Sequence, residues 1–149
     1  MKKLNLEQGS DAWLEARFKY FCASEAPAMM GESKFMSRNQ LLMKKKGFAE
    51  KSDKNKDFIF AAGHESEKKA RELLEIELLE SFDPCVCVES VSGVDLLASL
   101  DGLSDDGKTI FEHKLINKTL AQNTENGLIE PHYYWQLEHQ LLVTGADFV

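Results

Sequence analysis

The stretch ASLDGLSDDGKTIFEHK, residues 98–114, decides the expected fold, because it joins two apolar segments through a run of turn-forming residues. Residues 95–100 predict one strand, and TIFEHKLI, residues 109–116, predicts the next. Between them, DGLSDDGK is rich in Asp and Gly, which indicates a hairpin-type loop. The sequence therefore predicts a hairpin whose turn opens at Asp101.

The second strand of this hairpin carries Glu112 and Lys114, which are two residues apart and so leave the same face. The turn would place Asp101 close to Glu112. If the opposite face, marked by Phe111, lies in the core, the Glu112 face opens to a cleft. The alternative is that Asp101 is only a turn aspartate, which is a common role.

The rest of the chain predicts helices around these strands. Before the hairpin, a β-branched alternating run, CVCVESV, indicates one more strand, and after it Pro131 opens a helix. This order predicts an α/β (α+β) fold with one mixed sheet flanked by helices, in a single domain over residues 1–149. We expect helices over 10–21, 24–31, 37–47, 58–82 and 131–143, a strand over 85–91, an irregular segment over 117–130, and the start of a strand at 146–149.

Composition excludes several classes of protein. The chain has 149 residues and a formal net charge of −7, which argues against a protein that coats nucleic acid by bulk electrostatics. No segment approaches the roughly 20 apolar residues that span a bilayer, and the N-terminus has no apolar signal segment, so we expect a cytoplasmic protein without a membrane partner. Three cysteines are an odd count, which argues against a disulfide framework.

Two carboxylates and one ammonium group, from Asp101, Glu112 and Lys114, suit the hydrolysis of a phosphodiester. Carboxylate oxygens are ligands that Mg²⁺ prefers, and a bound metal polarises a phosphate and activates water. Lys114 would orient or deprotonate that water, or offset charge that develops on the phosphate.

Two further polar residues lie in apolar helical stripes. Glu67 shares a stripe with Ala70 and Leu74, where a carboxylate is costly unless it is paired with Arg71 or lies near a metal. Gln136 lies in the apolar stripe of the last helix, where it either hydrogen-bonds to a neighbouring element or reaches into the cleft. The pattern leaves both pairs of alternatives open.

Three features indicate contacts with phosphate. Arg17 would donate the paired N–H groups of its guanidinium to a phosphate. Ser24, at a helix N-terminus, would hold a phosphate together with backbone N–H groups. Their alternatives are a surface charge and a helix cap. Residues 44–57 hold six Lys against three acidic residues, which indicates either a solvated loop or a phosphate-contacting segment.

Four motifs in order resemble those of the YqaJ-type viral recombinase (phage lambda exonuclease) family of the PD-(D/E)XK nuclease superfamily. The chain departs from the family at Leu100, where proline is usual, and at His113, where an apolar residue is usual. It also ends at ADFV, where the next strand should form, so we expect a domain shortened after the closing helix. The motifs are QGSDAWLEARFKYFCASEAPAMMG, GHESEKKARELLE, ASLDGL with FEHK, and HYYWQLEHQLLVTG.

This resemblance implies a restriction-endonuclease-like core and Mg²⁺-dependent digestion of linear double-stranded DNA from 5′ ends in phage-type recombination, with Mn²⁺ able to substitute. It also implies a ring-shaped trimer, a single-strand annealing protein as partner, and a bacterial host or phage-infected cell. By position it makes Asp101 and Glu112 metal ligands, Lys114 the catalytic lysine, Glu67 the helix glutamate near the metal, Gln136 the glutamine of the closing helix, and Arg17 and Ser24 the 5′-phosphate contacts.

Two alternatives to an active exonuclease come from other classes. The net charge of −7 and the early end of the chain favour a DNA-end-binding or assembly module with weak or no catalysis. Cys22, Cys85 and Cys87 prompt an iron–sulfur nuclease, but three cysteines do not complete a four-cysteine cluster.

Overall fold

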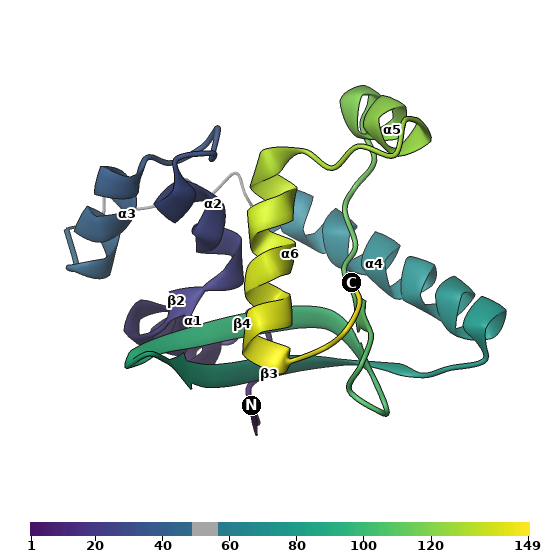
Figure 1. The fold of residues 1–149 in the computed structure, drawn as a ribbon, viewed down its shortest axis with the longest axis horizontal. Helices are drawn as coiled ribbons and strands as arrows, with labels where there is room; N and C mark the ends of the chain where they lie inside the picture. Colours follow the sequence, from purple (N-terminus) through teal and green to yellow (C-terminus); the bar gives the residue numbers. More distant parts are fainter. Residues whose placement is uncertain (49–56) are drawn as a thin grey trace.

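The computed structural model describes residues 1–48 and 57–149 (Figure 1). In these ranges a mainly helical N-terminal part is followed by three consecutive strands and two closing helices. The elements are β1 (Lys2–Leu4), α1 (Asp11–Lys19), β2 (Phe21–Cys22), the 3₁₀ helix η1 (Ala23–Glu25), α2 (Ala26–Met30), α3 (Arg38–Lys45), α4 (Asp57–Leu78), β3 (Phe82–Val91), β4 (Val94–Ser104), β5 (Ile110–Phe111), α5 (Lys118–Glu125) and α6 (Pro131–Thr144).

The long β3–β4 hairpin is the centre of a mixed sheet. The path through the sheet is β1-β3-β4-β2, and β5 pairs with β4 beside it. Most pairs are antiparallel, as predicted, but the short β2 runs parallel to β4. The α/β architecture with one mixed sheet is therefore confirmed.

Helices cover both faces of this sheet, so alternate residues of β4 enter two different cores. Leu96, Ala98 and Leu100 pack with Val143 of α6 on one face. Leu97 packs on the other face with residues of β3 and with Trp13 of α1. The indole N–H of Trp13 also donates to Ser99 Oγ at 2.8 Å, which ties α1 to the middle of β4. In Figure 1, α6 crosses over the sheet and α1 lies at its other side.

The N-terminal helices follow their local signals. Ser10 caps α1 by accepting from the Trp13 N–H, and Ser37 caps α3 with Gln40 completing a capping box. Gly31 ends α2 in the left-handed conformation, as its position predicted. Ser24 is not a helix cap, because it lies inside η1.

The boundaries around the β3–β4 hairpin differ from the prediction. Helix α4 ends at Leu78 and β3 begins at Phe82, whose side chain is buried in the core instead of ending the helix. Strand β4 continues through Asp101 to Ser104, because Leu100 and Leu103 are both buried and keep the chain in the sheet. Asp101 therefore lies within a strand and not at a turn.

The segment that follows β4 also differs from the prediction. Strand β5 covers only Ile110–Phe111, so Glu112 and Lys114 lie in the irregular chain that follows it. The core face is that of Ile110 and not that of Phe111, because Ile110 is 3% exposed. Residues predicted to be irregular form α5, whose N-cap is Asn117. The predicted last strand is reduced to a single bridge between Thr109 and Phe148.

Among the helices of the described ranges, none is long and apolar enough to cross a membrane.

Gly102, next to Asp101, is required by close packing. A Cβ at this position would lie 2.8 Å from Phe82 Cβ and 3.2 Å from Phe111 Cβ. The Phe82 and Phe111 rings approach each other to 6.4 Å between centroids. The glycine therefore lets two aromatic side chains meet over the strand that carries Asp101.

We expect Gly102→Ala to lower the free energy of unfolding by about 1–3 kcal/mol, because the added methyl group overpacks the contact with Phe82. Denaturant unfolding of the purified protein measures this change. Ser90→Ala, on the exposed side of β3, is the control and should stay within about 0.5 kcal/mol of the parent. Equal stability of Gly102→Ala and the parent would contradict the packing account.

Candidate active site

The carboxylate of Glu112 is the most enclosed charged group of the site, with a side chain only 7% exposed. Gln136 Nε2 donates to Glu112 Oε1 at 2.6 Å, and Gln140 Nε2 donates to Glu112 Oε2 at 2.6 Å. Lys114 Nζ pairs with Oε1 as well. Both oxygens of the buried carboxylate are thus held by donors, two of them from α6.

Asp101 reaches the same region from β4. Its Oδ2 accepts a hydrogen bond of 2.8 Å from the backbone N–H of His113, which follows Glu112 in the chain. Burial, and after it the nearby charge of Glu112, raise the pKa of Asp101 to about 7. The structure therefore brings together the two carboxylates that the sequence singled out, although by a strand and not by the predicted turn.

Glu67 lies beside this pair on α4. Its charge also raises the pKa of Asp101, after the larger effects of burial and of Glu112. Arg71 Nη1 pairs with Glu67 Oε1 at 2.9 Å and also donates to the backbone oxygen of Asp101 at 2.6 Å. The ion-pair reading of Glu67 is therefore confirmed, and the pair attaches α4 to the carboxylate site. The role of Glu67 near a metal stays a prediction.

Lys114 is the cation of the site that is most open to solvent, with a side chain 29% exposed. Its Nζ lies 5.7 Å from the ring centroid of Tyr133 on α6. Its neighbour His113 is accommodated in part by a 3.3 Å contact between its Nε2 and Ser66 Oγ. The partly exposed ammonium of Lys114 is therefore within reach of a ligand that arrives from solvent.

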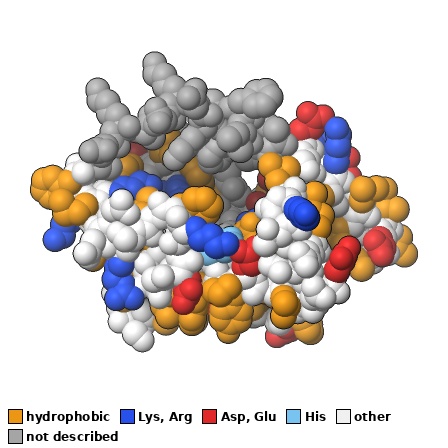
Figure 2. Space-filling model, turned by 90° about the horizontal axis from the view of Figure 1, so that it is seen from above, with side chains coloured by type: hydrophobic (Ala, Val, Ile, Leu, Met, Phe, Trp, Pro, Cys, Tyr) orange, Lys and Arg blue, Asp and Glu red, His pale blue; other side chains and the backbone are white. Residues whose placement is uncertain are grey.

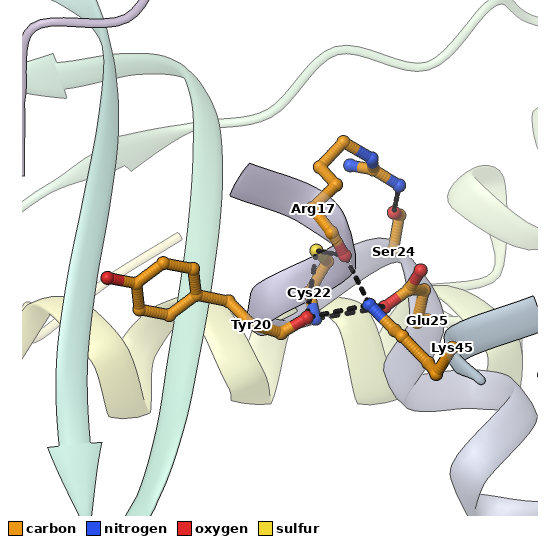
Figure 3. Close-up of polar contacts among 6 residues, drawn as sticks. All are labelled: Arg17, Tyr20, Cys22, Ser24, Glu25 and Lys45. Atoms are coloured by element: carbon orange, nitrogen blue, oxygen red, sulfur yellow. Dashed lines mark hydrogen bonds and ion pairs between the residues drawn. The ribbon is translucent and has the colours of Figure 1, made fainter. Parts of the chain in front are cut away.

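Arg17 and Ser24 form a separate group on α1 and η1 (Figure 3). Arg17 Nη2 donates to Ser24 Oγ at 3.0 Å, and the guanidinium lies 4.6 Å above the ring of Trp13. The structure confirms that these two residues are adjacent in space. Their predicted contact with phosphate is not tested by the geometry.

Among the coloured side chains on the face drawn in Figure 2, both charge signs occur, with hydrophobic side chains between them. The residues 44–57 that were predicted as a basic segment lie for the most part outside the described ranges.

The donor set of the site fits a hard divalent cation. Asp101 and Glu112 offer carboxylate oxygens, and their mutual repulsion is the condition that a cation between them would relieve. In the ranges that the structure covers, no three His, Cys, Asp or Glu side chains are gathered into a complete metal site. Mg²⁺ commonly uses one or two carboxylates and completes its shell with water and substrate.

Three residues of the site were not selected from the sequence. Gln140 occupies the same apolar stripe as Gln136, which was the available signal. Arg71 was considered only as the ion-pair partner of Glu67, and Tyr133 only as part of the α6 stripe. Their contacts with the carboxylate cluster depend on the packing of α4 and α6, which spacing alone does not specify.

Comparison with known proteins identifies a family and solved structures with a similar fold. Residues 12–147 match the model of the YqaJ-like viral recombinase domain. The crystal structure of the alkaline exonuclease LHK-Exo from Laribacter hongkongensis matches with a TM-score of 0.70 and 25% identity, over 92% of this chain and 70% of that chain. LHK-Exo in complex with dAMP matches with a TM-score of 0.71, the same identity and the same coverage. No curated protein matches the chain. The fold is thus similar to that of an alkaline exonuclease, consistent with a PD-(D/E)XK core.

We expect Asp101→Asn to stabilise the protein at pH 8 in EDTA. A carboxyl whose pKa is raised from 3.8 to about 7 binds a proton more readily in the folded state, so its contribution to stability falls as pH rises through this window. Asparagine keeps the hydrogen-bond acceptor but does not ionise. The gain should reach at most about 4 kcal/mol at pH 8 and should nearly disappear near pH 4.

Thermal unfolding at both pH values measures this effect. Asp95→Asn, at an exposed position of the same strand, is the matched control. A variant Asp101→Asn that is less stable than the parent at pH 8 would show that ionised Asp101 is favourable where it lies.

Proposed function

This chain belongs to the family of YqaJ-like viral recombinase domains, nucleases of phage-type recombination, and we propose that it digests linear double-stranded DNA from 5′ ends with Mg²⁺. The observation that carries this proposal is the meeting of Asp101 and Glu112 next to Lys114. Asp101 comes from β4 and the other two residues from the segment that follows β5, and the hydrogen bonds described above hold them together.

Asp101 and Glu112 would hold the metal ion, with Glu67 as a further oxygen donor at its side. When bound, Mg²⁺ or a substituting Mn²⁺ supplies Lewis acidity at the scissile phosphate and lowers the pKa of water. The hydrogen bonds from Gln136 and Gln140 would keep the Glu112 carboxylate in one orientation. In this role Gln136 holds a carboxylate oxygen, and not the nucleophilic water.

Lys114 has the position of a general base or of an electrostatic stabiliser. Its ammonium contacts Glu112 and remains partly open to solvent, so an arriving phosphate would compete for it. There it would orient or deprotonate the attacking water, or offset negative charge that grows on the phosphate.

Arg17 and Ser24 would contact the 5′-phosphate at the DNA end. A guanidinium offers planar paired N–H donors that match phosphate oxygens, and Trp13 beneath it limits its rotamers. The hydrogen bond to Ser24 aligns both groups before a phosphate arrives. This separation of end binding from hydrolysis would give the enzyme a preference for 5′-phosphorylated ends.

A DNA-end-binding module without catalysis is the second candidate. It is favoured by the formal net charge of −7. A homo-oligomer such as a ring trimer, a single-strand annealing protein as partner and a cytoplasmic location remain proposals that the same family membership suggests.

We expect wild-type protein to degrade linear 5′-phosphorylated duplex in Mg²⁺, and Asp101→Ala and Lys114→Ala to lower the rate by about 100-fold or more. Gel electrophoresis of end-labelled duplex measures the loss. Asp95→Asn, at an exposed position of β4, should keep the parental rate. Binding without degradation in Mg²⁺ and in Mn²⁺ would instead support the end-binding module.

We expect Arg17→Ala to weaken the preference for 5′-phosphate over 5′-hydroxyl ends by about tenfold or more, because a charge-assisted contact contributes about 1.5–3 kcal/mol. The measurement is the ratio of the initial rates on two duplexes that differ only at the 5′ end. Ser24→Ala should give a smaller loss of the same sign. An unchanged ratio in Arg17→Ala would remove Arg17 from the phosphate site.

A further inference from the structure

A second, buried cluster lies directly under the Arg17–Ser24 pair (Figure 3). Lys45, at the end of α3, points its ammonium into the turn that joins α1 to η1. There Nζ contacts the backbone oxygen of Arg17, lies 2.6 Å from the backbone oxygen of Tyr20, and pairs with Glu25 Oε2 at 2.6 Å. The Lys45 and Glu25 side chains are 11% and 8% exposed.

The contacts of Lys45 use its whole donor capacity. An ammonium has three N–H groups, and the three oxygens around this one accept all of them. Its charge is balanced by Glu25. Lys45 is therefore occupied within the protein and does not act as a phosphate-binding lysine in this arrangement.

The two backbone oxygens lie where helix α1 ends. The last carbonyls of a helix have no partner inside the helix and need donors from elsewhere. Lys45 supplies these donors from a different helix, so its hydrogen bonds hold the end of α1 against α3. One of them is accepted by the carbonyl of Arg17, which fixes the backbone from which the guanidinium extends.

Glu25 fastens the other end of the same turn. Its Oε2 accepts from the backbone N–H of Cys22 at 3.1 Å while it pairs with Lys45. Ser24 directly precedes Glu25 in η1, so the carboxylate limits the position of the hydroxyl that meets Arg17. One buried ion pair thus controls both ends of the segment that carries the exposed pair.

We propose that Lys45 and Glu25 are positioning residues for the 5′-phosphate contact, which they set from the buried side without touching DNA. This inference rests on the proposed contact of Arg17 and Ser24 with a 5′-phosphate. Discrimination between 5′ ends depends on the relative placement of a guanidinium and a hydroxyl. A shift of about 1 Å in such a pair is sufficient to reduce binding strongly.

The test measures affinity for the end group apart from cleavage. Fluorescence anisotropy in EDTA gives the dissociation constants for a 5′-phosphate duplex and a 5′-hydroxyl duplex of the same sequence. Their ratio is the readout, because a loss of folded protein lowers both affinities equally. The double variant Lys45→Met with Glu25→Gln removes the fastening without leaving a buried charge unpaired.

We expect the ratio to fall by at least about fivefold in the double variant. Lys45→Arg, which keeps the charge but spreads its donors over a plane, should lower the ratio by at least about twofold. Lys19→Met is the matched control, since it removes an exposed lysine near the same end of α1, and its ratio should stay within about twofold of the parent.

Three results would overturn the inference. The first is a folded double variant whose ratio equals that of the parent. If the double variant does not fold, a parental ratio in Lys45→Arg overturns the inference instead. The second is an equal fall in Lys19→Met, which would indicate a general effect of charge. The third is a wild-type ratio near one, which would overturn the 5′-phosphate contact as well. If the ratio falls in Arg17→Ala but stays parental in both Lys45 variants, the 5′-phosphate contact stands and only the positioning role of Lys45 and Glu25 is overturned.

Discussion

The buried carboxylate of Glu112 is the constraint on which the centre of the structure depends. A charge that is removed from water is costly unless donors surround it, and here the donors are Gln136, Gln140 and Lys114. Two of these donors lie one helical turn apart on α6. Helix α6 must therefore sit over the end of β5 with its amide side chains facing inward, and its apolar residues then cover the sheet.

The same buried carboxylate also makes the site unfavourable for the stability of the free protein. Asp101 meets Glu112 in a partly buried place, and both burial and the second charge raise its pKa. A fold selected only for stability would not place two carboxylates together there. Such groups are expected where a cation and a phosphate are bound, because the ligand then supplies the charge that the free protein lacks.

A second ion pair serves a different purpose at the other group of residues. Lys45 and Glu25 are enclosed and mutually satisfied, so they hold the turn between α1 and η1. Arg17 and Ser24 are on the outer side of that turn and remain able to meet a ligand. The molecule thus separates groups that position the chain from groups that are free to bind.

The sequence alone determined the fold class, the helices expected over 10–21 and 37–47, and the chemistry of the residues that meet in the site, because helix signals and the choice of carboxylates are local properties. It did not determine the turn after Ser104, since Leu103 and Gly102 enter the sheet only through contacts with Phe82 and Phe111. Nor did it determine the roles of Gln140, Arg71 and Lys45, whose partners are 28, 30 and 25–28 residues away. Those roles were decided by tertiary structure, because a buried charge takes its donors from whichever elements the packing brings to it.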